Sequence, residues 1–142
     1  MVSESVLLIS TLTFAIELTV LGLLTVAYFL QRMQNYRLHG ITMTSALVLH
    51  LITIFSWMLM SLIRYLIDTP VNLGNPLILA TLAHVTFGTI AASLGVWLVG
   101  SWHLQTDVQK CFPRKRIMLL TITSWVTAIS IGIVLYLAVV LS

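Results

Sequence analysis

The chain has 142 residues, of which 59% are hydrophobic and 8% are charged, and its mean hydropathy is +1.06. A soluble domain carries about 25% charged residues, so this composition excludes a soluble globular protein and points to lipid as the solvent. The net charge is +3. The basic residues lie between the apolar runs, which is typical of membrane topology and argues against a nucleic-acid partner. A single cysteine excludes an internal disulfide.

Four apolar runs predict membrane-spanning helices at about residues 5–31, 41–67, 76–102 and 116–141. Each run exceeds the roughly 20 residues that cross about 30 Å of hydrocarbon. The connections are short, so neighbouring helices should be antiparallel. We therefore expect one all-α domain over residues 1–142, an up-and-down four-helix transmembrane bundle. The first run lacks a basic region before it, and we interpret it as a mature helix, not a removable signal.

The charges of the connections predict an orientation. The loops 31–40 and 103–116 contain the basic residues Arg32, Arg37, Lys110, Arg114, Lys115 and Arg116, whereas the other side has Glu4 and Asp68 and no lysine. The positive-inside rule then predicts a multi-pass protein of the cell membrane, with both loops cytoplasmic and both termini outside. Besides lipid, the expected partners are membrane subunits of a larger complex or further copies of this chain.

Polar residues within the apolar runs are costly and mark candidate functional sites. On the second helix they recur at steps of three, four and seven, which predicts one stripe facing the bundle interior. Its members are His39, Met43, Ala46, His50, Trp57, Ser61, Arg64 and Asp68. The first helix contributes Glu17 near mid-membrane, where an isolated carboxylate would be neutral or paired. His50, His84 and Arg64 are its candidate partners.

A haem site is one hypothesis for the histidines. His84 leads into a face of small residues, Gly88, Ala91 and Gly95, which suits either a flat macrocycle or tight helix packing. In an antiparallel pair of helices, two residues at the same depth in the membrane have residue numbers that add up to a constant. For the second and third helices this sum is about 142 to 143. The numbers of His50 and His84 add up to less than this sum, which corresponds to a difference in depth of roughly 12 Å. This difference disfavours a haem held between them.

Copper is a second hypothesis. His39 and Met43 lie one helical turn apart, His103 is level with His39, and Cys111 follows in the same loop. Imidazole and soft sulfur suit reduced copper. The alternative is structural: His39 and His103 as interfacial residues, and His50 and His84 as interhelical hydrogen-bonding groups. We find no phosphate-binding loop and no catalytic triad, so we do not expect an enzyme.

Several short motifs after Tyr36 resemble the YozB/CtaM-like family of four-helix membrane proteins, which is associated with haem–copper oxidase maturation. They are Arg37-Leu38-His39-Gly40 with Met43 and Ala46, Arg64, Leu73-Gly74-Asn75-Pro76, His84, Arg114-Lys115-Arg116-Ile117, Thr121, Trp125 and Gly132-Ile133-Val134-Leu135-Tyr136. The family usually has a histidine before the fourth helix, where this chain has Arg114 or Lys115. The family set is therefore either incomplete or completed by His103.

The resemblance implies a respiratory-chain membrane protein that assists the assembly of a haem–copper terminal oxidase or accompanies it as an accessory subunit. His39 and His84 are the first-choice ligands or contacts, because both the polar pattern and the resemblance select them. Two alternatives stay open. The first is a b-type cytochrome that binds haem and transfers electrons, and the second is a purely structural subunit without a cofactor.

Overall fold

The computed structural model describes residues 4–68, 74–102 and 115–141, and all secondary structure in this part of the chain is helical. The helices are α1 (Glu4–Arg32), α2 (Tyr36–Thr53), the π-helix η1 (Ile54–Met58), α3 (Leu59–Asp68), α4 (Pro76–Trp102) and α6 (Lys115–Val140). Helices α2, η1 and α3 form one continuous span. The predicted all-α four-helix bundle is confirmed, and four spans are long and apolar enough to cross a membrane.

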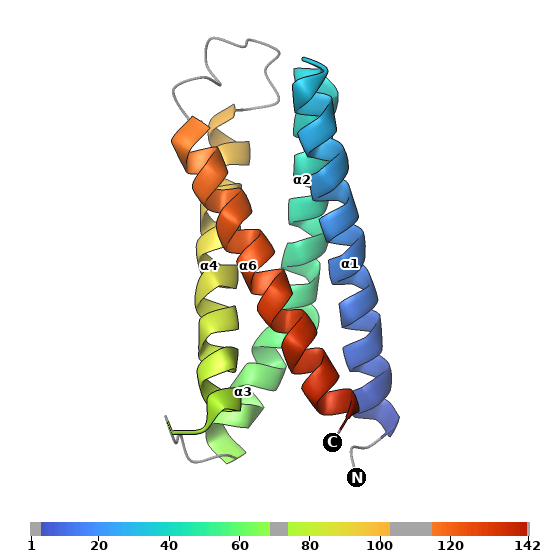
Figure 1. The fold of residues 1–142 in the computed structure, drawn as a ribbon, viewed down its shortest axis with the longest axis vertical. Coiled ribbons are helices and arrows are strands. Elements are labelled where there is room, and N and C mark those ends of the chain that lie inside the picture. Colours follow the sequence, from blue (N-terminus) through green and yellow to red (C-terminus); the bar gives the residue numbers. More distant parts are fainter. Residues whose placement is uncertain (1–3, 69–73, 103–114, 142) are drawn as a thin grey trace.

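The four spans pack as a ring of antiparallel neighbours (Figure 1). Helix α1 packs against α2 and α6, and α4 packs against α6 and α2. The start of α1 and the end of α6 lie at one end of the bundle, and the α1–α2 turn lies at the opposite end (Figure 1). Helices α2 and α6 therefore both start at the end that has the α1–α2 turn.

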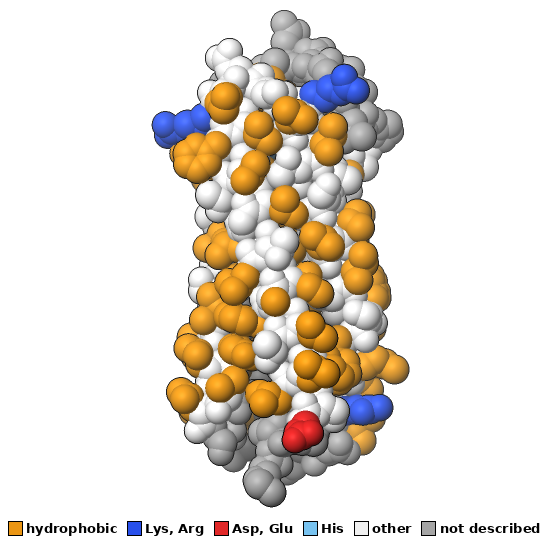
Figure 2. Space-filling view, turned by 90° about the vertical axis from the view of Figure 1, so that its right-hand side faces the viewer, with side chains coloured by type: hydrophobic (Ala, Val, Ile, Leu, Met, Phe, Trp, Pro, Cys, Tyr) orange, Lys and Arg blue, Asp and Glu red, His pale blue; other side chains and the backbone are white. Residues whose placement is uncertain are grey.

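The interior is a narrow core, and the outside is apolar. The core contains Val20, Leu24, Ala46, Leu47, Ala91, Trp125 and Ile129, with Trp125 fully buried. Large hydrophobic side chains such as Leu12, Ile52, Leu79 and Leu119 are exposed on every span. Figure 2 shows hydrophobic side chains along the middle of one face, with the charged side chains toward its two ends. This distribution matches a multi-pass membrane protein whose apolar surface is covered by lipid.

The turn between α1 and α2 is tighter than the sequence predicted. Helix α2 begins at Tyr36, so it includes His39, which the sequence placed in a loop over 31–40. The Asn35 N–H donates to the Leu30 carbonyl and the Gln34 N–H to the Gln31 carbonyl, which is the pattern of a Schellman motif. Gln34 has φ 59°, in the left-handed region. Asn35 then caps α2, because its side-chain oxygen accepts the Leu38 N–H at 3.3 Å.

The π-helix breaks the stripe that the sequence predicted on the second span. The Leu59 N–H donates to the Ile54 carbonyl, five residues back, and one extra residue in a turn rotates the following helix by about 100°. His39, Ala46 and His50 are buried before this turn. Arg64, after it, is exposed. The expectation that one continuous stripe faces the interior is therefore wrong at Arg64, whereas Trp57 and Ser61 are half-buried. The side chain of Asp68 lies outside the described residues.

We expect Gln34→Gly to stabilise the protein by about 0.5–1 kcal/mol. Glycine removes the steric strain that a side chain causes in the left-handed conformation. Part of this gain is lost because glycine loses more conformational entropy on folding. The thermal unfolding temperature in detergent should rise. Gln31→Gly, placed in the last turn of α1, is the control and should lower it. A lower unfolding temperature for Gln34→Gly would contradict the strain argument.

Candidate functional site

A buried carboxylate joins α1 to the end of α2. Glu17 lies within one residue of the midpoint of α1, and it is 8% exposed. Its Oε1 accepts a hydrogen bond from His50 Nδ1 at 2.9 Å, and the Thr53 hydroxyl lies 2.9 Å from the same oxygen. Hydrocarbon offers no water to such a group, so these two donors supply the hydrogen bonds of Oε1 from within the protein. Of the three partners that the sequence proposed for Glu17, the structure brings His50 to it.

The other side of the His50 ring meets α6. The His50 and Trp125 ring centroids are 5.0 Å apart. His50 Nε2 and Trp125 Nε1 are both buried without a hydrogen-bond partner among the described residues. The indole N–H is a donor, and Nε2 of a neutral imidazole whose proton is on Nδ1 is an acceptor. The two atoms therefore have complementary hydrogen-bonding character in a dry layer of the bundle.

His84 joins α4 to α6 at a different level from His50. Its Nδ1 lies 2.8 Å from the Ala128 carbonyl oxygen, and a carbonyl accepts, so Nδ1–H donates. The ring also lies against Gly132, where an added Cβ would come within 3.0 Å of His84 Cε1. The small residue at position 132 is what allows this close approach. His50 and His84 therefore contact α6 at different turns, beside Trp125 in one case and between Ala128 and Gly132 in the other.

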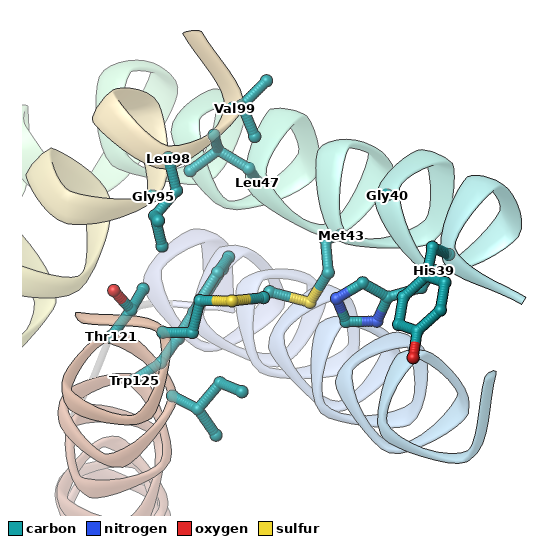
Figure 3. A pocket seen from close by; sticks show the side chains of 12 residues that line it. His39, Gly40, Met43, Leu47, Gly95, Leu98, Val99, Thr121 and Trp125 are labelled. Carbon is teal, nitrogen blue, oxygen red and sulfur yellow. The ribbon is translucent and has the colours of Figure 1, made fainter. Parts of the chain in front are cut away.

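His39 lies at the opposite side of the core from His84 and lines a pocket. Its Nδ1 lies 2.8 Å from the Ala27 carbonyl oxygen of α1, and the side chain is 4% exposed. The pocket lies between α2, α4 and α6 and has a volume of about 60 Å³. His39, Met43, Leu47, Gly95, Met118 and Trp125 are among the residues that line it. Figure 3 shows the His39 ring and the Met43 thioether side by side at one end of this pocket.

The sequence missed two contributors to these sites, Thr53 and Met118. Thr53 is three residues after His50 and so shares its helix face, which is a usable signal. Met118 is three residues after the start of α6, as His39 is three residues after the start of α2. Because both helices start at the same end of the bundle, equal distances from their starts place the two residues at similar depth. Once the first residues of α2 and α6 are known, their equal distances to His39 and Met118 therefore identify Met118 as a neighbour of His39.

The described residues contain only part of the copper set and of the four-histidine set. His103 and Cys111, which belong to the copper set and to the four-histidine set, lie outside the described residues. Among the described residues, no three His, Cys, Asp or Glu side chains come together as a metal site would require. Arg64 is exposed, and the side chains that contact the Glu17 carboxyl group among the described residues are those of His50 and Thr53.

The three described histidines lie in separate surroundings. His39 borders a pocket of about 60 Å³ between α2, α4 and α6. His84 lies directly against the backbone of α6 at Gly132. His50 is 3% exposed and is packed between Glu17 and Trp125. Among the described residues, His39, His50 and His84 therefore do not face one common pocket, and His39 is the one that borders the pocket between α2, α4 and α6.

No family model, curated protein or solved structure matches this chain. The resemblance to the YozB/CtaM-like family thus stays a prediction from the sequence motifs.

We expect His50→Leu to lower the free energy of unfolding by about 1–3 kcal/mol, because it leaves the Glu17 carboxyl group buried without its main hydrogen-bond partner. Adding Glu17→Leu should recover part of this loss, so the two changes should not be additive. Reversible denaturant unfolding in detergent measures the cycle. Glu4→Gln, on the exposed first turn of α1, is the control and should change stability by less than about 0.5 kcal/mol. Additive effects of the two core substitutions would rule out this coupling.

Proposed function

We propose that this chain is a respiratory-chain membrane protein that assists the assembly of a haem–copper terminal oxidase or accompanies it as an accessory subunit. The observation that supports the proposal is the convergence of the residues that carry the family resemblance. His39 and Met43 from α2 line the same pocket as Thr121 and Trp125 from α6. Residues far apart in the sequence thus meet at one place, as expected for a shared site and not for four independent packing positions.

The bonding of the other two histidines favours a structural role for them. His50 and His84 each use Nδ1 to hold a neighbouring helix, and interhelical hydrogen bonds of this kind stabilise membrane bundles by about 0.6–2 kcal/mol. A purely structural subunit would use its histidines only in this way. The pocket beside His39 is the feature that this alternative leaves unexplained.

Deleting the gene in its native host should lower haem–copper oxidase activity in isolated membranes, and the wild-type chain should restore it. His39→Leu and Met43→Leu should restore it poorly, because both change the pocket. Met60→Leu is the matched control, since Met60 is 56% exposed on the lipid-facing surface. The oxidase haem spectrum and the copper content of the membranes should be recorded in parallel. Normal oxidase in the deletion strain would reject the proposed role.

We further propose that the segments 31–40 and 103–116 lie at the cytoplasmic end of the bundle, because they contain six of the seven basic residues of the chain. The single cysteine, Cys111, allows a direct test. A membrane-impermeant maleimide should leave Cys111 unlabelled in intact cells and label it after permeabilisation. Glu4→Cys in a Cys111→Ser background is the opposite control and should be labelled in intact cells. Labelling of Cys111 in intact cells would reverse the orientation.

A further inference from the structure

We propose that the pocket between α2, α4 and α6 binds one copper(I) ion through His39 Nε2 and the thioether sulfurs of Met43 and Met118. This ligand set differs from the one that the sequence alone indicated, because Met118 takes the place of His103 and Cys111. The inference deepens the proposed oxidase role and rests on it for its biological purpose. The site itself is defined by the described residues.

The hydrogen bond of His39 prepares its ring as a ligand. The Ala27 carbonyl oxygen at 2.8 Å can only accept, so Nδ1 keeps its proton, and in the neutral ring the lone pair is on Nε2. A histidine that binds a metal through one nitrogen usually donates the other N–H to a carbonyl or carboxylate in this way. Because His39 lines the pocket and is nearly fully buried, its orientation is fixed by the fold.

The sulfur ligands come from opposite walls of the pocket. Met43 follows His39 by one turn of α2 and lies beside its ring (Figure 3), and Met118 lines the pocket from α6. Thioethers are soft ligands that favour copper(I) over hard or borderline ions such as magnesium and zinc. The lining contains no carboxylate, which removes the ligands that calcium or magnesium would need.

The charge of the ion also selects copper(I). All three ligands are neutral, so the ion's own charge stays in an apolar surrounding formed by Leu47, Gly95 and Trp125. The Born cost of placing an ion there scales with the square of its charge, and a divalent ion would cost about four times as much as a monovalent one. The volume of about 60 Å³ accommodates an ion.

The position of the pocket suits reduced copper. His39 and Met118 both lie three residues after the start of their helices, so the pocket is close to the end of the bundle that has the basic residues. In the proposed orientation this end faces the cytoplasm, where reductants prevail.

Titration of the purified full-length protein in detergent tests the site, under anaerobic conditions with ascorbate and a competing copper(I) chelator. We expect one copper(I) per chain and X-ray absorption that shows both nitrogen and sulfur neighbours. Met43→Leu and Met118→Leu conserve volume, and each should weaken binding by at least about 10-fold, since even indirect ligand support is worth about 10–100-fold. His39→Asn should do the same. Circular dichroism and thermal unfolding show that each variant is folded.

Two sets of controls make the assignment specific. Met33→Leu and Met60→Leu remove thioethers that are 76% and 56% exposed, and they should leave copper binding unchanged. Cys111→Ser and His103→Ala should also leave it unchanged. Absence of binding, or binding that depends on Cys111 and not on Met118, would overturn the proposed site.

The outcome separates this site from the proposed function. Failure to bind copper with loss of oxidase in the deletion strain overturns the copper site alone. Copper binding that depends on the three ligands, in a host whose oxidase is normal without the gene, supports the site and overturns the oxidase role.

Discussion

A carboxylate at the middle of a membrane-spanning helix must find its hydrogen-bond donors in another helix, because hydrocarbon provides none. Glu17 meets this requirement through His50 and Thr53, and the requirement fixes how α1 and α2 can pack. Sliding or rotating either helix by one residue would separate Oε1 from both donors. Contacts between Leu or Val side chains do not fix the register in this way, because these side chains can contact lipid tails, which are equally apolar. The polar contact thus sets the register in which Val20, Leu24, Ala46 and Leu47 form the core.

The same contact is coupled to the break in the second span. Thr53 is the last residue of α2, and its single hydroxyl proton is shared between the His50 carbonyl oxygen at 2.8 Å and Glu17 Oε1 at 2.9 Å. Side-chain hydroxyls that bond to carbonyls of the preceding turn compete with the regular backbone ladder. The Ser56 hydroxyl also donates to the Ile52 carbonyl, at 2.6 Å. The π-turn follows directly, and in Figure 1 α3 continues toward α4 along a different line from α2.

Hydrophobicity and charge were sufficient to predict the four spans and their antiparallel order, because both follow from the thickness of hydrocarbon. The partner of Glu17 was among three candidates, and choosing His50 needed the relative rotation of α1 and α2. The buried stripe was right from His39 to His50 and wrong at Arg64, because the π-turn adds one residue that no hydrophobic pattern reveals. Met118 was missed for a related reason, since its depth depends on where α2 and α6 begin.

His39, His50 and His84 all use Nδ1 to reach a neighbouring helix, through Ala27, Glu17 and Ala128. What distinguishes them is the surrounding of Nε2. That atom of His50 is sealed in the core beside Trp125, and the His84 ring lies against Gly132. The His39 ring instead borders a pocket with thioethers. The same Nδ1 hydrogen bond thus occurs in histidines with two different roles. Where the core is closed around Nε2, the histidine is structural, and where a pocket borders the ring, the histidine is a candidate ligand. Function in this bundle therefore depends on the packing around Nε2.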